Sequence, residues 1–354
     1  MTKAPTASDV ARRAEVSRSA VSLVLGGNAK RARLSEETQE RVRKAAEELN
    51  YRPNAAGRSL VRGRTETIGL VIRDLELIGI DPFLLPLLDG ILEATREQGY
   101  RVLVESMRDG AGDPFGDLMD SGRIDGMIVE NPDFGDKSLS RLIQSNRPVV
   151  VMGSQGLEEE VSVSIDDFQI GLVATEHLVS LGRRRIAHIA YAKTGIYAVD
   201  KRFAGYQAAM NKAGLPVDPA LVTHANFSIE SGYLAMVRLL SAGTMPDAVF
   251  ATSDAVAMGA IAAIQDAGYR VPADIAVASV DDISAARFFR PALTTVTSEP
   301  YACGKLAAEM LIDLMGGHAP PKRSVMVDTR LIVRGSTVEN YSDGLLEAAK
   351  AALQ

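Results

Sequence analysis

The stretch "SDVARRAEVSRSAVSLVL", residues Ser8–Leu25, determines how the whole chain is interpreted, because it holds two short helical patterns only three residues apart. In the first pattern Val10, Ala11 and Ala14 recur at helical spacing and fall on one face. Thr6 is a suitable N-cap residue, and an acidic residue three positions later gives a weak form of the capping box. We therefore predict a helix that begins after Thr6 and buries this face.

The second pattern begins after Ser17, which is a good N-cap residue. Val21, Val24 and Leu25 form its buried stripe. A short polar helix that starts with an arginine suits DNA recognition, because the N-terminal residues of such a helix reach base edges in the major groove. The face opposite the stripe carries Arg18, Ser19, Ser22 and Leu23.

A third helical pattern, which begins at Ser35, can complete a small core with the first two. Asn50 can end this helix, and Pro53 prevents its continuation. Its buried positions are predicted to be Val42, Ala45, Ala46 and Leu49.

The charge of the chain is unevenly distributed. The 354 residues carry a net charge of −6, but residues 1–64 hold 14 Lys and Arg against 7 Asp and Glu, a balance of +7 that leaves −13 for the remainder. A basic head on an acidic body is typical of a DNA-binding module fused to a domain that does not bind DNA. The alternative is that the charges of the head form an ordinary solvated surface.

Beyond residue 66, short apolar runs alternate with helical patterns over roughly 270 residues. This alternation predicts an α/β fold of parallel sheets with helices on both faces, in two layers rather than one. The helical patterns span residues 84–100, 170–183, 201–215 and 255–269. The predicted strands are 67–72, 101–105, 126–130, 148–152, 185–190, 247–252 and 275–280.

The segment from Thr6 to Ile72 resembles the DNA-binding head of the lac repressor/galactose repressor (LacI/GalR) family. It combines the helix pair "DVARRAEVSRSAVSLVLGG", the elbow "YRPN" and a hinge sequence. The resemblance implies a three-helix helix-turn-helix head that binds a palindromic operator in double-stranded DNA. The DNA-contacting positions that it implies are Thr6, Ser17, Arg18, Ser19, Ala20, Ser22, Leu23, Tyr51, Asn54, Ala55, Arg58 and Leu60.

Two residues of the head depart from the family pattern. Glu15 stands where a turn glycine is usual, and a left-handed backbone would cost Glu more than Gly, so we expect a slightly remodelled turn. Leu23 stands where many members carry an arginine that reads guanine, which leaves Arg18 as the best candidate for a guanine contact. The operator sequence of better-known relatives is therefore not transferable.

The hinge "NAAGRSL", residues 54–60, is a weak helix that is too short to be stable alone. By the resemblance it folds on specific DNA, where Leu60 wedges between central base pairs in the minor groove. Gly57 stands where alanine is common, and we expect it to make hinge folding more dependent on DNA. The alternative is a plain interdomain linker.

The body resembles the family's effector domain, which is similar to periplasmic sugar-binding proteins of type I. This resemblance rests on segments such as "RRRIAHIA", "KRFAGYQAAMNKAGL" and "ALTTVTSEPYACGKLAAEML". It implies two lobes of doubly wound parallel sheet and a small-molecule site between them, at the carboxyl ends of the strands. The implied effector-binding residues are Asp81, Phe83, Arg202, Phe227, Ser253 and Asp281.

Single cleft residues could instead form ordinary salt bridges or core contacts. Arg202 and Asp281 together suit a polyhydroxylated ligand, because one donates hydrogen bonds and the other accepts them. Gly153 stands where Asp is common and Ser298 where Gln is common, which predicts fewer polar groups and therefore a different or smaller ligand, or more water in the site. The effector is expected to be a sugar or a sugar derivative.

Two other classes of protein are less consistent with the sequence. An enzyme would need a catalytic motif, and the chain has neither a dinucleotide-binding G-x-G-x-x-G nor a P-loop, while its four histidines show no metal spacing. A secreted solute-binding protein would need a signal peptide, which the first ten residues do not resemble. No apolar run approaches the roughly 18 residues of a membrane span. The lone Cys303 can form no internal disulfide.

We therefore predict a cytoplasmic, nucleoid-associated transcriptional regulator, most often a repressor in this family, without metal or cofactor. We expect a homodimer, because the C-terminal pattern of Leu346, Ala349 and Leu353 is too short to support tetramers. The expected parts are a helix-turn-helix domain (1–53), a hinge (54–65), an effector-binding and dimerisation domain (66–340) with crossovers near 165, 295 and 328, and a tail (341–354).

Overall fold

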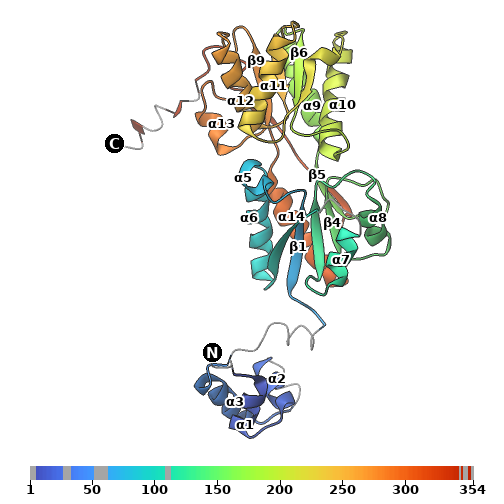
Figure 1. Cartoon of the computed structure of the whole chain (residues 1–354), viewed down its shortest axis with the longest axis vertical. Coiled ribbons are helices and arrows are strands. Elements are labelled where there is room, and N and C mark those ends of the chain that lie inside the picture. Colours follow the sequence, from blue (N-terminus) through green and yellow to red (C-terminus); the bar gives the residue numbers. More distant parts are fainter. Residues whose placement is uncertain are drawn as a thin grey trace. The chain divides into compact units, whose positions relative to one another are not determined.

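The computed structural model describes residues 5–26, 33–51, 63–107, 113–342, 344–345 and 350–351. The chain divides into a small head, which runs to Glu66, and a large body, which begins at Thr67 (Figure 1). Each unit has a hydrophobic core of its own, so each is described separately.

The head contains three helices, α1 (Ala7–Ala14), α2 (Arg18–Leu25) and α3 (Glu36–Glu48). Capping begins all three as predicted: the Asp9 carboxylate accepts hydrogen bonds from the backbone N–H and the hydroxyl of Thr6, and the hydroxyls of Ser17 and Ser35 accept backbone N–H groups of α2 and α3. The predicted apolar faces then meet in one core, which is made of Val10, Ala11, Ala14, Val21, Val24, Val42, Ala45 and Ala46.

The turn between α1 and α2 corrects one expectation. Glu15 adopts the left-handed conformation itself, with φ 54° and ψ 47°, so the turn keeps its geometry despite the missing glycine. For a residue other than glycine this conformation costs about 1–2 kcal/mol. The head therefore carries local strain instead of a remodelled turn.

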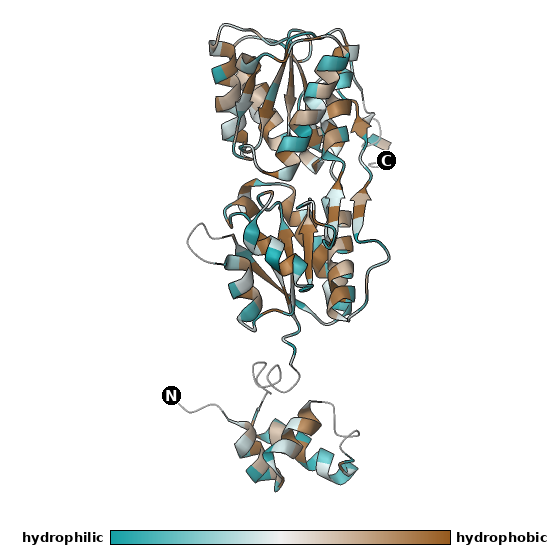
Figure 2. Ribbon diagram, turned by 90° about the vertical axis from the view of Figure 1, so that its right-hand side faces the viewer, coloured by the Kyte–Doolittle hydropathy of each residue, from teal (hydrophilic) through white to brown (hydrophobic). Residues whose placement is uncertain are grey.

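The body consists of two lobes, each built on a six-stranded sheet with helices on both faces (Figures 1 and 2). The N-lobe sheet has the order β11-β5-β4-β3-β1-β2, and the C-lobe sheet has the order β12-β10-β9-β8-β6-β7. The N-lobe strands are β1 (Thr67–Ile72), β2 (Arg101–Ser106), β3 (Gly126–Glu130), β4 (Val149–Met152), β5 (Ser162–Ile165) and β11 (Ser324–Val327). The C-lobe strands are β6 (Ile186–Ala190), β7 (Val222–His224), β8 (Ala248–Ala251), β9 (Ala276–Asp281), β10 (Thr294–Thr297) and β12 (Leu331–Ile332).

All seven predicted strands are present, and Figure 2 shows the strands of both sheets as mainly hydrophobic. Five short strands, β5, β7, β10, β11 and β12, were missed. The pairing is parallel throughout, with the exception of edge strand β12, which runs antiparallel to β10 and corrects the expectation of purely parallel sheets.

The helices include the four that the sequence predicts. Those of the N-lobe are α5 (Leu77–Ile80), α6 (Leu84–Glu97), α7 (Pro114–Asp120), α8 (Lys137–Gln144) and α14 (Pro300–Met315). Those of the C-lobe are α9 (Asp167–Ser180), α10 (Tyr197–Lys212), α11 (Ile229–Ser241), α12 (Asp254–Asp266) and α13 (Ser284–Phe288), with a 3₁₀ turn at Pro219–Leu221.

The chain crosses between the lobes three times: after β5 into α9, after β10 into α14, and between β11 and β12. Each lobe is therefore assembled from separate stretches of sequence. The two lobes can change their relative arrangement only through these three crossings, which all lie at the carboxyl ends of strands.

Helices α9 and α10 approach each other unusually closely. A Cβ atom on Gly171 would lie 2.0 Å from the carbonyl oxygen of Arg202, and one on Gly205 would lie 2.1 Å from the carbonyl oxygen of Phe168. Both positions therefore exclude any side chain. The close approach fixes the N-terminal halves of both helices against each other, which matters because these halves carry Asp167 and Arg202.

Candidate functional site

A cavity of about 580 Å³, partly open to solvent, lies between the two lobes of the body. Its walls come from residues at or just after the carboxyl ends of strands, which is where ligands bind in open parallel sheets. Glu130 ends β3, Tyr191 follows β6 and Asp281 ends β9. All six residues that the resemblance assigns to the effector site line this cavity: Asp81, Phe83, Arg202, Phe227, Ser253 and Asp281.

Arg202 is fixed in the wall of the cavity by three contacts. Its Nε donates to Asp167 Oδ1 at 2.8 Å, and its Nη1 donates to the carbonyl oxygen of Thr252 at 2.7 Å. Its Cζ also lies 5.2 Å from the ring centroid of Tyr191. Burial by itself would lower the pKa of Arg202, but the charge of Asp167 raises it above its usual value. The only permanent positive charge among the described lining residues is thus already paired.

The same cavity contains further buried carboxyl groups. Burial raises the pKa of Asp81 to about 6 and that of Glu130 to about 8, and burial also raises the pKa of Asp281 well above its usual value. One oxygen of Asp81 accepts the backbone N–H of Phe83 at 2.9 Å. Together with Asp167, the lining therefore presents four carboxyl groups to one guanidinium. Sequence reasoning missed Glu130, Asp167 and Tyr191.

Aromatic and hydroxyl groups complete the C-lobe wall. The rings of Phe227 and Tyr191 lie 4.7 Å apart at 41°, which makes a continuous apolar surface. The Ser253 hydroxyl caps α12 by accepting the N–H of Val256 at 3.3 Å. Both Phe227, with φ 70°, and Asp281, with φ 117°, have backbone conformations that cost of order 1–3 kcal/mol each. Such strain is characteristic of positions whose side-chain direction matters.

The head presents a polar surface along α2. The side chains of Arg18, Ser19 and Ser22 are exposed, and that of Leu23 is half-buried. Thr6 and Ser17 are also exposed, although both take part in helix caps.

Two residues expected at the DNA surface are placed differently. Ala20 is buried, with 8% of its surface exposed, so its side chain does not present the DNA contact that the resemblance implies. Tyr51 packs against the core of the head. The predicted hinge contacts Asn54, Ala55, Arg58 and Leu60 lie outside the described residues, as do Gly57 and the tail residues Leu346, Ala349 and Leu353.

Comparison with known proteins decides the family. Residues 6–54 match the model of bacterial regulatory proteins of the lacI family, and residues 175–337 match a periplasmic binding protein-like domain. The HTH-type transcriptional regulator CelR of Thermobifida fusca is 34% identical over 337 residues, which cover 94% of this chain and 98% of CelR. This chain belongs to the LacI family.

Solved structures of LacI-family proteins agree with the fold. A transcriptional regulator CelR–cellobiose complex has a TM-score of 0.70 at 32% identity and covers 94% of this chain and 99% of its own. The Lac repressor dimer bound to operator and the anti-inducer ONPF has a TM-score of 0.80 at 26% identity, covering 95% and 100%. The protein is therefore a DNA-binding transcriptional regulator of the LacI family, and its relatives are regulators as well. In the part of the chain that the structure describes, no helix is long and apolar enough to cross a membrane.

The departures of this LacI-family member from the usual pattern gain a structural explanation. Gly153 has φ 104°, a conformation that disfavours a side chain, and it contributes no polar side chain to the cavity wall. Ser298 is fully buried and does not belong to the lining; its hydroxyl points to the carbonyl oxygen of Asp281 at 3.5 Å. Glu130 and Asp167 contribute two further carboxyl groups to the cavity that the sequence analysis did not include.

Proposed function

We propose that this LacI-family regulator is a repressor whose affinity for its operator is controlled by a sugar or sugar derivative bound in the cavity between the lobes. The observation that carries the proposal is the composition of this cavity: hydrogen-bond acceptors, one paired arginine and an aromatic wall, contributed by both lobes. The CelR relative was solved with cellobiose, which is a ligand of the same chemistry.

The excess of carboxyl groups over cationic groups in the lining favours neutral or cationic ligands over anionic ones. Sugar hydroxyls donate well to the carboxyl groups of Asp81, Glu130 and Asp281, and an apolar sugar face packs well on an aromatic ring such as Phe227. A phosphate or carboxylate would instead face several acidic groups, while the charge of Arg202 is already compensated by Asp167. We therefore expect unmodified sugars, amino sugars or nucleosides to bind, and sugar phosphates and nucleotides to be rejected.

We further propose that two copies pair through their bodies, so that two heads reach half-sites about one helical turn, 34–36 Å, apart. Exposed apolar side chains on the body support pairing: Leu85 and Leu92 lie seven residues apart on α6, and Ile229, Leu234 and Val237 lie on α11. The Lac repressor structure is a dimer bound to operator. We also propose that the protein acts in the cytoplasm, where DNA is found and where the thiol of Cys303 would stay reduced.

A thermal-shift panel on the full chain tests the effector. The compounds are cellobiose, glucose, glucosamine and adenosine, together with their anionic partners glucose 6-phosphate and adenosine monophosphate. A ligand at 100 times its Kd adds about 2.7 kcal/mol of stability. The shift should be lost in Asp281→Asn and retained in Asp266→Asn, which makes the same change at an exposed carboxylate. A shift from the phosphorylated compounds alone would contradict the proposed ligand class.

Selection of bound sequences from random duplex DNA tests the operator. We expect a palindrome with two half-sites, and we expect Arg18→Ala to weaken and relax the base preference at one position per half-site by about 1–3 kcal/mol. Arg141→Ala, a charge removal in the body, serves as the control. Binding without any base preference would contradict the proposal.

A further inference from the structure

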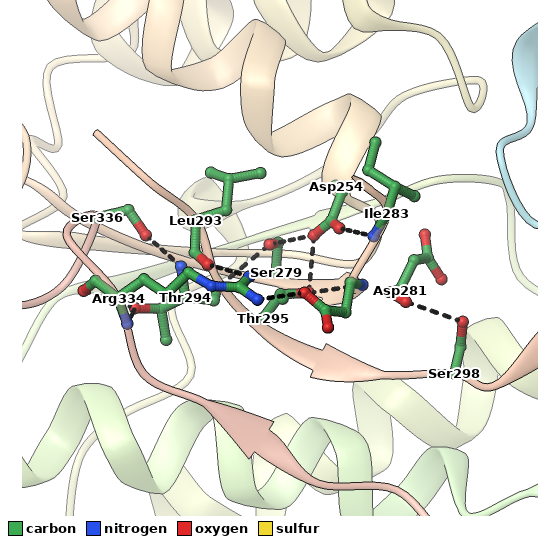
Figure 3. Close-up of polar contacts among 11 residues, drawn as sticks. Asp254, Ser279, Asp281, Ile283, Leu293, Thr294, Thr295, Ser298, Arg334 and Ser336 are labelled. Carbon is green, nitrogen blue, oxygen red and sulfur yellow. Dashed lines mark hydrogen bonds and ion pairs between the residues drawn. The ribbon is translucent and has the colours of Figure 1, made fainter. Parts of the chain in front are cut away.

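The cavity carboxylate of Asp281 is carried by a strained turn at the end of β9. Asp281 and the following Asp282 both have positive φ, 117° and 56°, although neither is glycine. Two consecutive residues rarely adopt such conformations unless the surrounding structure imposes them. The contacts that impose them are therefore the contacts that direct Asp281 (Figure 3).

Three interactions from residues that do not line the cavity fix the turn. The N–H of Asp282 donates to the Thr295 hydroxyl at 3.2 Å, and the N–H of Ile283 donates to Asp254 Oδ2 at 2.9 Å. The Asp282 carboxylate also pairs with Arg334 Nη2 at 2.7 Å. Backbone and side chain of the turn are thus both held, as the dashed lines in Figure 3 show.

The groups that hold the turn are themselves buried and connected. Asp254 is fully buried, and its Oδ1 accepts the hydroxyls of Ser279 at 2.5 Å and Thr295 at 2.7 Å. Arg334 has 6% of its surface exposed and donates to the carbonyl oxygen of Leu293 at 3.0 Å. Buried polar networks of this kind are rigid when every member is satisfied.

The same network reaches two of the three crossings between the lobes. Thr295 lies in β10, which leads into the crossing toward α14, and Arg334 follows β12, which comes directly after the crossing from β11. The two crossings are joined to each other, because the N–H of Thr297 donates to the carbonyl oxygen of Arg330 at 2.9 Å and the N–H of Arg330 donates back to the Thr297 hydroxyl at 3.1 Å.

We propose that Asp254, Thr295 and Arg334 are positioning residues that direct Asp281 into the cavity and join its turn to two interlobe crossings. The role of Asp281 as a ligand contact rests on the proposed function. A ligand that binds Asp281 then shifts the position of the turn, and the hydrogen-bond network transmits this shift to the segments through which the lobes must rearrange. The three residues act without lining the cavity themselves.

Hydrogen exchange of the full chain, followed by mass spectrometry without ligand or DNA, tests this arrangement. In Arg334→Met we expect the amides of residues 281–283 to exchange at least tenfold faster than in the unaltered protein. We expect the amides of Thr297 and Arg330 to accelerate with them. The amides of the central strand β8 should stay unchanged.

Three further variants make the result specific. Thr295→Val removes the hydroxyl that accepts the N–H of Asp282. It should accelerate exchange of the Ile283 and Arg330 amides as well as that of the Asp282 amide. Asp282→Asn keeps an oxygen acceptor and suits a left-handed backbone, so it should stay within threefold of the unaltered rates. Ser336→Ala removes a hydroxyl that is fully buried nearby but does not contact the turn. This variant should leave the exchange rates of residues 281–283 unchanged.

The proposal is overturned if Arg334→Met and Thr295→Val accelerate the turn no more than Ser336→Ala does. It is equally overturned if the turn accelerates while Thr297 and Arg330 do not, since the crossings would then be independent of it. If Arg334→Met does not fold, the exchange rates of Thr295→Val alone test the proposal. The absence of any sugar-dependent thermal shift would refute the proposed function and would not change these exchange rates.

Discussion

Replacing Arg202 by Met should destabilise the body by about 3–5 kcal/mol, because it breaks a buried ion pair from one side. The side chains of Arg202 and Asp167 are 5% and 4% exposed, and their charged atoms lie 2.8 Å apart. Methionine restores much of the lost volume, so the main cost is the charge of Asp167, which would remain buried without its partner.

This cost should depend on pH in a defined direction. Burial already raises the pKa of Asp167, and loss of the guanidinium raises it further. A carboxyl group whose pKa is higher in the folded than in the unfolded state takes up a proton on folding, so its contribution to stability falls as pH rises from about 4 through the folded pKa. The deficit of Arg202→Met should therefore be smaller at pH 5 than at pH 8.

Urea unfolding monitored by circular dichroism at both pH values, for Arg202→Met, Asp167→Asn and the double variant, measures these effects. The double variant should lose clearly less than the sum of the two single variants, because no unpaired charge remains. Additive losses, or an Arg202→Met deficit that is equal at pH 5 and pH 8, would refute the argument that the buried Asp167 charge is responsible.

Three further predictions concern other residues. In urea unfolding, Glu130→Gln should be as stable as the unaltered protein near pH 4 and more stable than it as pH rises toward 9. The reason is that burial raises the pKa of Glu130 from 4.5 to about 8. At about 1.4 kcal/mol per tenfold change in proton affinity, the gain in unfolding free energy has an upper limit of about 5 kcal/mol. Glu15→Gly should stabilise the head by about 1 kcal/mol in calorimetry, because glycine adopts the left-handed conformation without strain; a loss of stability would mean that the Glu15 side chain contributes contacts of its own. Gly205→Ala should cost about 3 kcal/mol of unfolding free energy and weaken ligand-dependent thermal shifts, since the new Cβ would meet the Phe168 carbonyl oxygen at 2.1 Å. Ala at Gly182, an exposed residue of the turn after α9, would meet no atom and be strained only by its φ of 84°.

Two of the five strands that the sequence failed to predict, β5 and β10, share a physical cause. β10 reads "TTVT" and β5 reads "SVSI", so neither forms an apolar run, yet both are fully buried. In β10 the Thr294 hydroxyl is satisfied by the N–H of Arg334 at 2.7 Å, and the Thr295 hydroxyl donates to Asp254. These partners are distant in sequence, so periodicity alone could not reveal that polar residues would be buried there.

In the candidate site too, some residues could be predicted from the local sequence and others depend on contacts between residues that are distant in sequence. The six cavity residues came from the resemblance to the family, and the structure places all of them around one cavity. Glu130 and Tyr191 were missed although both stand where a predicted strand ends, a position that the geometry of parallel sheets marks for ligand contact. Asp167 carried no such signal, since its role depends on the glycine-mediated approach of α9 to α10.

Regulation requires the ligand to bind one lobe arrangement more tightly than the other, and the groups in this cavity can provide the necessary difference in binding free energy. Shifting a two-state equilibrium of lobe arrangements from 1:99 to 99:1 requires a ligand to bind one arrangement about 5.5 kcal/mol more tightly than the other. A hydrogen bond to a charged group contributes about 1.5–3 kcal/mol and a neutral one about 0.5–1.5 kcal/mol. Two to four bonds to ionised groups made in only one arrangement are therefore sufficient, whereas about four or more are needed with neutral carboxyl groups. Asp81 and Glu130 belong to one lobe and Asp167 and Asp281 to the other. A ligand that touches both sets must lose some of these bonds when the lobes move, which makes its binding sensitive to their arrangement.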